Sequence, residues 1–202
     1  GGRVVLGLGA GWQVNEHEQY GIELPPPGER LARLDEACHV VKGLLRSPST
    51  TFEGEHYQLR GALCEPKPVQ QPLPLLIGGK GDRMLGLVAR HADEWNMWSL
   101  PEVMAERSRK LAEHCEAIGR DPSTIRRSTQ ALVMVTDDPA RARELVERVA
   151  PRAAVAGPPE HFAEVVEQWA EVGVDEVIVP DFVLGTGAAR LERLDALRAA
   201  VT

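Results

Sequence analysis

The stretch Val4-Val5-Leu6-Gly7-Leu8-Gly9-Ala10-Gly11-Trp12 lies near the start of the chain and combines an uninterrupted apolar run with a glycine-rich end. Such a run, without alternating polar positions, is typical of a strand covered on both faces, as in a parallel sheet. Glycines directly after the run predict a tight turn. We therefore expect a buried strand over residues 4–8, a turn over residues 9–11 and, because of three consecutive prolines, an irregular loop over residues 12–28.

A second stretch repeats this arrangement in the middle of the chain. Leu75-Leu76-Ile77 predicts another buried strand, Gly78-Gly79-Lys80-Gly81 closes it, and a helix is expected from there to about Arg90. Glycines before a helix allow backbone N–H groups to approach an anion, and the helix N-terminus favours negative charge. Lys80 and Arg83 would add positive charge. The loop is either a phosphate cradle or a plain turn, and its own residues fit both.

Apolar strands alternate with amphipathic helices along the whole chain. Because the strands lie far apart in sequence, crossover connections and a parallel sheet are expected rather than hairpins. We predict an α/β fold and one domain over residues 1–202. Expected strands cover residues 4–8, 75–77, 94–98, 129–135 and 174–179; expected helices cover residues 29–46, 82–90, 99–119, the stretch after 138, 158–172 and 191–201; a small hairpin is expected within residues 51–63.

Bulk composition narrows the class of protein. The net charge of −7 argues against a nucleic-acid surface, which needs clustered Lys and Arg. No apolar run approaches the roughly 18 residues that a membrane span needs. Three widely spaced cysteines, Cys38, Cys64 and Cys115, suggest neither disulfides nor metal-ligand pairs, so a cytoplasmic protein without a metal site is expected. Cys38 and Cys115 fall on apolar helix faces, which predicts burial.

The first glycine turn also invites a dinucleotide-binding interpretation. That fingerprint needs a third glycine and an immediate helix, whereas Trp12 stands there and the prolines delay the helix. Trp12, Trp95 and Trp98 fall near strand ends, where an aromatic ring can form a cofactor wall or simply pack in a core. His17 is a candidate proton relay or a structural histidine. No catalytic residue is assigned.

Taken together, the motifs resemble the luciferase-like monooxygenase superfamily, most closely its branch that uses coenzyme F420, a deazaflavin. Their order and spacing carry the resemblance, which extends over nearly the whole chain. The motifs are Gly7-Leu8-Gly9-Ala10-Gly11-Trp12, Asn15-Glu16-His17, Tyr20-Gly21-Ile22, Glu29-Arg30-Leu31, Leu34-Asp35-Glu36, Phe52-Glu53-Gly54 with Tyr57, Pro66-Lys67-Pro68-Val69-Gln70, Ile77-Gly78-Gly79, Ala89-Arg90-His91-Ala92-Asp93 and Gly173-Val174-Asp175-Glu176-Val177-Ile178-Val179.

The resemblance implies a luciferase-like (β/α)8 TIM barrel and hydride transfer between coenzyme F420 and an unidentified small organic substrate. It implies that Asn15 lies near the deazaflavin ring and that the second glycine loop holds the phosphate. The first turn, with Trp12 where one branch has a glutamate, would line the coenzyme. The implied coenzyme-binding residues are Gly9, Ala10, Gly11, Trp12, Asn15, Gly78, Gly79, Lys80 and Gly81.

The chain matches only strands four to eight of that barrel. A complete barrel usually needs about 250 residues, so an incomplete barrel with open edges is expected, and open edges favour self-association. Two alternatives stay open beside the F420 enzyme. One is a monooxygenase of the same fold that uses flavin mononucleotide (FMN), and the other is a truncated, non-catalytic fragment that binds a ligand or another copy of itself.

Overall fold

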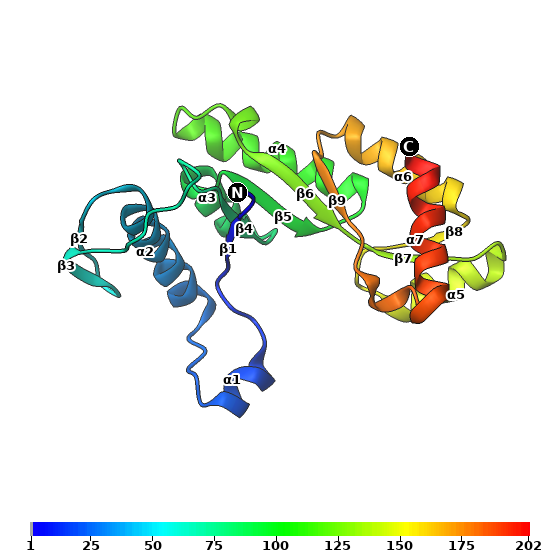
Figure 1. The fold of residues 1–202 in the computed structure, drawn as a ribbon, viewed down its shortest axis with the longest axis horizontal. Coiled ribbons are helices and arrows are strands. Elements are labelled where there is room, and N and C mark those ends of the chain that lie inside the picture. Colours follow the sequence, from blue (N-terminus) through cyan, green and yellow to red (C-terminus); the bar gives the residue numbers. More distant parts are fainter. Residues whose placement is uncertain (1) are drawn as a thin grey trace. The chain divides into compact units, whose positions relative to one another are not determined.

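The computed structural model describes residues 2–202, which form α-helices and β-strands arranged in two compact units (Figure 1). Unit 1 comprises residues 1–95 and 114–125, and unit 2 comprises residues 96–113 and 126–202. The boundary falls inside strand β5 (Glu94–Trp98) and inside helix α4 (Pro101–Ala117), so both elements contribute residues to each unit. The expected α/β class with parallel strand pairing is confirmed.

Unit 1 is built on β1 (Leu6–Leu8), β4 (Leu75–Gly78) and the start of β5. β1 and β4 pair in parallel, with Leu6 opposite Leu75 and Leu8 opposite Ile77. Their ends therefore bring the two glycine loops to the same edge. The other elements of this unit are α1 (Val14–Tyr20), α2 (Pro27–Arg46), the expected antiparallel hairpin β2 (Thr50–Glu53) and β3 (Gln58–Ala62), α3 (Asp82–His91) and a short 3-10 helix, Pro122–Thr124.

Unit 2 contains the remainder of β5 and two parallel strand pairs. β6 (Arg126–Gln130) pairs with β9 (Glu176–Ile178), and β7 (Leu132–Val135) pairs with β8 (Ala154–Gly157). Apolar side chains of β7 and β8 form its core with Trp98 and Leu145. Its helices are most of α4, then α5 (Pro139–Val149), α6 (Pro159–Glu171) and α7 (Gly187–Val201), with a 3-10 helix at Asp181–Val183.

The expectation that residues 12–28 are irregular is wrong in two places. Residues 14–20 form α1, which ends at Gly21 in the left-handed conformation with a φ of 65°. The prolines follow this helix instead of preventing it. Pro27 also begins α2 two residues earlier than expected, because the first turn of a helix needs no N–H from its first residue.

The single strand expected over residues 129–135 is two strands that separate at Ala131. Gln130 pairs with Ile178 of β9, whereas Leu132 pairs with Ala154 of β8, so the chain changes partner at this point. β8 itself was not expected, because its alanine-rich sequence carries little strand propensity. The last helix begins at Gly187 instead of residue 191, and β9 is shorter than the expected strand over residues 174–179.

Candidate functional site

The loop Gly78-Gly79-Lys80-Gly81 connects β4 to α3, as the sequence predicts. Gly79 has a φ of +134°, which L side chains rarely adopt. Gly81 is the N-cap of α3 and has no side chain to cap the first-turn N–H groups. The first-turn N–H groups of α3 are therefore left without a capping side chain, and the positive end of the helix dipole lies at the same place. A negatively charged group at the loop would accept hydrogen bonds from these N–H groups and interact favourably with the dipole.

Trp95 holds this loop from the core side. Its indole is fully buried, so packing is its role instead of the cofactor wall that the sequence left open. The indole Nε1 donates a hydrogen bond of 2.7 Å to the carbonyl oxygen of Gly79. In a trans peptide the C=O and the following N–H point in opposite directions. The N–H of Lys80 therefore points away from the core.

A cavity of about 400 Å³ lies against the loop within unit 1. Gly79, Lys80 and Gly81 line it together with Ala10 of the first glycine turn. The two glycine loops thus meet, as the parallel pairing of β1 with β4 requires. The complete lining is Ala10, Pro27, Arg30, Leu31, Gly79, Lys80, Gly81, Arg83 and Met84.

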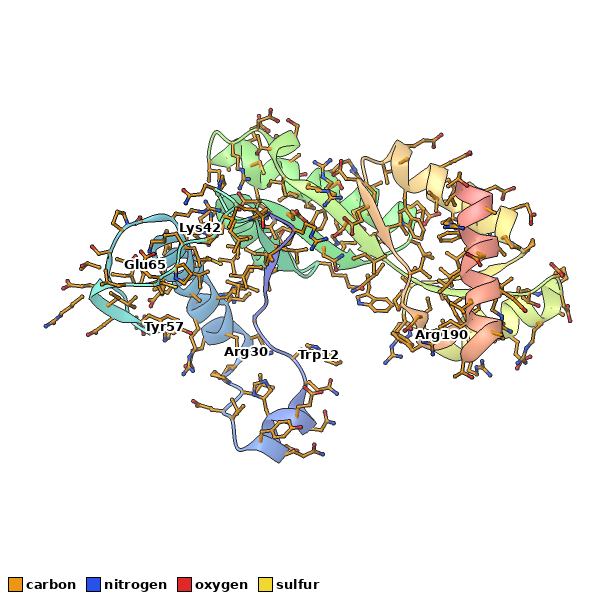
Figure 2. The ribbon with its side chains drawn as sticks, in the orientation of Figure 1. Trp12, Arg30, Lys42, Tyr57, Glu65 and Arg190 are labelled. Atoms are coloured by element: carbon orange, nitrogen blue, oxygen red, sulfur yellow. The ribbon has the colours of Figure 1, made fainter. Side chains whose placement is uncertain are left out.

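Arg30 of α2 is a site residue that the sequence analysis did not single out. Its Nη1 donates to the carbonyl oxygen of Gly11 at 2.5 Å, which ties α2 to the first glycine turn (Figure 2). Its Nε is buried and has no hydrogen-bond partner within the described residues. Arg30 also lines the cavity, where its guanidinium contributes positive charge. The signal was present in Glu29-Arg30-Leu31, but only as one piece of the family resemblance.

Charge around the cavity is mainly positive. Arg30, Lys80 and Arg83 line it. The one carboxylate in the first turn of α3 is that of Asp82, which lies 3.2 Å from the ring Nε2 of His114. Three cations and uncapped N–H groups form a setting for a phosphate-like anion.

The remaining predicted coenzyme residues lie outside the lining of this cavity. Gly9 lines a second hollow of about 220 Å³, which shares Ala10 and Arg30 with the first and includes His17. The His17 Nδ1 donates to the carbonyl oxygen of Ile22 at 3.2 Å, a structural bond at the end of α1. Trp12 is 76% exposed and Asn15 is exposed on α1, so the structure does not gather these two with the glycine loop.

The structure also brings together three potential metal ligands that spacing along the sequence did not indicate. Asp35 and His39 belong to α2, and His91 ends α3. Burial lowers the pKa of His91, although its hydrogen bond with Asp35 acts in the other direction. Desolvation raises the pKa of Asp35, but the hydrogen bond from His91 and the charge of Arg90 outweigh it and leave the pKa below its ordinary value.

Cys38 and Cys115 are buried free thiols, as their helix positions predicted. Burial raises the pKa of Cys38 to about 11. Across residues 2–202, none of the helices combines the length and the apolar character that crossing a bilayer requires.

Comparison with known proteins places these features in a family. A model of the luciferase-like monooxygenase family matches residues 1–176. An F420-dependent glucose-6-phosphate dehydrogenase of Kineococcus radiotolerans is 32% identical over 151 residues, which cover 71% of this chain and 43% of that relative. The chain thus matches less than half of the length of this curated relative.

Two solved structures share the fold. An F420-dependent secondary alcohol dehydrogenase in complex with an F420-acetone adduct has a TM-score of 0.78 and 21% identity, over 98% of this chain and 70% of that chain. A riboflavin lyase with modified FMN has a TM-score of 0.72 and 11% identity, over 92% of this chain and 60% of that chain. The predicted family is confirmed: this chain belongs to the luciferase-like monooxygenase family.

Proposed function

We propose that this chain is the coenzyme-binding portion of an oxidoreductase that transfers hydride between coenzyme F420 and a small organic substrate. The observation that carries the proposal is the glycine loop before α3, whose uncapped N–H groups face a cavity lined by three cations. The relative from Kineococcus, named for F420 dependence, supports the choice of coenzyme.

The residues present fit a phosphate group. A Cβ at Gly79 would meet Cγ of Met84 at 3.0 Å, so the cradle is shaped for bare backbone, whereas the space at Gly81 is open. Gly79, Lys80 and Gly81 would hold the phosphate through backbone N–H groups, and the guanidinium of Arg30, which lines the cavity, would pair with its charge. When bound, the coenzyme supplies a ring carbon that carries hydride.

The chain's own contribution is binding and orientation. Trp95 keeps the Gly79 carbonyl turned toward the core, and Arg30 joins the first glycine turn to α2. We propose that Gly9, Ala10, Gly11 and Asn15 continue the coenzyme site beyond the phosphate. Trp12, with its exposed indole, is the candidate for a ring wall, and His17 for a proton relay.

We propose a luciferase-like barrel as the architecture of the whole protein. Residues 1–202 form a single domain, which resembles strands four to eight of that barrel with their helices. The boundary between the two units runs through β5 and α4 instead of through a linker, which supports one domain. A cytoplasmic location, a homo-oligomer and the absence of nucleic-acid and metal partners stay predictions from the sequence.

A titration tests the coenzyme. Purified chain is titrated with coenzyme F420 and separately with FMN, and binding is followed by coenzyme fluorescence. We expect binding of F420 that weakens about tenfold in Arg30→Gln, the loss expected for a charge-assisted hydrogen bond. Arg60→Gln is the matched control, since it removes one exposed cation of β3 that does not line the cavity.

Each result selects among the interpretations. Binding of FMN alone would replace the F420 proposal with the monooxygenase alternative, which the FMN-containing neighbour supports. Binding of neither coenzyme would overturn the proposal for this chain and leave a non-catalytic module. Equal losses in Arg30→Gln and Arg60→Gln would show that general charge, and not the cavity, attracts the coenzyme.

A further inference from the structure

We infer that Asp35, His39 and His91 form a binding site for a divalent transition metal of the zinc class, joining α2 to the end of α3. This site is independent of the coenzyme cavity and of the function proposed above. Two imidazoles and one carboxylate are a donor set that Zn²⁺ and its neighbours in the first transition row bind, whereas Mg²⁺ and Ca²⁺ prefer oxygen alone.

The helical spacing places two of the donors side by side. Asp35 and His39 are four residues apart on α2, and residues at this spacing lie on the same face, one turn apart. His91 enters from the last position of α3. One potential ligand atom of each side chain lies within 4.8 Å of those of the other two.

Neighbouring side chains orient the rings before any metal binds. The His39 ring stacks on Phe52 with a centroid separation of 5.9 Å and an angle of 18°, and it meets the His91 ring edge-on at 4.7 Å. The Nε2 of His91 lies 2.5 Å from Oδ1 of Asp35. His91 is 3% exposed and His39 is exposed, so the site has a buried anchor and an open side for entry.

Metal entry needs only small movements. Two ligand atoms on a tetrahedral Zn²⁺ are about 3.3 Å apart, given bonds of about 2.0 Å. The contact between Asp35 and His91 would therefore open slightly, and the ring of His39 would shift a short way toward them, since the three ligand atoms already lie within 4.8 Å of one another. A water molecule would take the fourth position, as in zinc sites with three protein ligands.

Two cations face the site and limit its affinity. The Nη2 of Arg90 lies 3.1 Å from Oδ2 of Asp35, and Lys42 acts on His91 electrostatically. Arg90 would stay on Oδ2 and orient the carboxylate, the usual place of a second partner of a metal-bound carboxylate. Because both charges repel a cation, we expect micromolar binding instead of the tighter binding of closed structural zinc sites.

The test uses the full chain without an affinity tag, stripped with chelator and titrated calorimetrically with Zn²⁺. Co²⁺ is added in parallel, and its visible absorption reports the coordination geometry. His39→Ala removes an exposed donor, and Asp35→Asn keeps the size of the carboxylate; thermal melting checks that both variants fold. His161→Ala is the matched control, because His161 also pairs with a carboxylate, Glu164, at 3.3 Å.

We expect one Zn²⁺ per chain, a tetrahedral Co²⁺ spectrum, and at least about tenfold weaker binding in His39→Ala and in Asp35→Asn, with no change in His161→Ala. The inference is overturned if the stripped chain binds no Zn²⁺ in this range. It is equally overturned if folded His39→Ala and folded Asp35→Asn bind with the affinity and stoichiometry of the parent chain.

Discussion

The indole of Trp95 and the carbonyl oxygen of Gly79 are joined by a hydrogen bond of 2.7 Å, which links the core of unit 1 to the backbone of the candidate phosphate loop. Trp95 lies on β5 and Gly79 follows β4, so the bond forms between neighbouring segments of the parallel sheet. Because Trp95 is fully buried, the loop's peptide orientation depends on a side chain that never touches the cavity.

Trp95→Phe tests this dependence. The variant keeps an aromatic ring but leaves the Gly79 carbonyl without its indole donor, and one such bond contributes about 1 kcal/mol. We expect the free energy of unfolding to fall by at least that amount, measured by urea denaturation, and F420 affinity to fall severalfold. Trp98→Phe, in the core of unit 2, is the control. Unchanged coenzyme affinity in Trp95→Phe would show that the indole hydrogen bond does not support the coenzyme site.

Gly81→Asp tests the anion site with little strain. Gly81 has a φ of −68°, and an added Cβ meets nothing within 4 Å. At Gly79, by contrast, the φ is one that L side chains rarely adopt, and an added Cβ would meet Met84. Asp at an N-cap is at least as favourable as Gly. We therefore expect unchanged or slightly higher thermal stability together with a large loss of coenzyme affinity, since a carboxylate would repel the phosphate.

Gly81→Asn is its matched control, because it has nearly the same size and N-cap preference but no charge. Coenzyme affinity should fall much less in this variant. Equal affinity in Gly81→Asp and Gly81→Asn would show that negative charge at the start of α3 does not matter, and the phosphate assignment would then fail.

The carboxylate of Glu36 accepts backbone N–H groups from Glu55, His56 and Tyr57, and so closes the turn of the β2–β3 hairpin. Desolvation raises the pKa of Glu36, but the hydrogen bonds together lower it by more than desolvation raises it. The pKa of Glu36 therefore lies below its ordinary value of 4.5. A lowered folded-state pKa gives stability that is present above pH 4.5 and is lost as the pH falls through the folded-state pKa.

Glu36→Gln should therefore lower the melting temperature at pH 7. The difference in melting temperature between this variant and the parent chain should shrink as the pH falls below 4.5, the ordinary pKa of the Glu36 carboxyl. Melting curves by circular dichroism at several pH values measure this. Glu55→Gln, in the same turn, is the control and should show no comparable trend. A difference that stays constant across the pH range would contradict the role of the Glu36 charge.

The three thiols should differ in reactivity. Cys38 and Cys115 are fully buried, and burial raises the pKa of Cys38 to about 11, so its reactive thiolate is scarce at pH 8. Cys64 is only partly buried. We expect one thiol per chain to react rapidly with a thiol-specific chromogenic disulfide at pH 8, and three after denaturation. Rapid reaction of two or more in the folded chain would contradict the packing of α2 or α4.

Local sequence was informative wherever neighbouring residues alone decide the structure. The apolar runs before both glycine loops predicted β1 and β4, and the spacing of apolar residues predicted the burial of Cys38 and Cys115. The turn at Gly78 to Gly81 was predicted because glycine tolerates its backbone angles and a helix follows at once. Prediction from local sequence failed at α1 and β8, because these short segments have weak propensities for helix and strand.

By itself, the sequence determined the α/β class, the parallel strands, the family and the two glycine loops, because these depend on runs of adjacent residues and on motif order. Only the tertiary structure decided that Arg30 reaches Gly11, that Trp95 holds Gly79, and that His91 meets Asp35 and His39. These residues lie 16 to 56 positions apart or on different helices. Their contacts depend on how helices pack against strands, which no local pattern encodes.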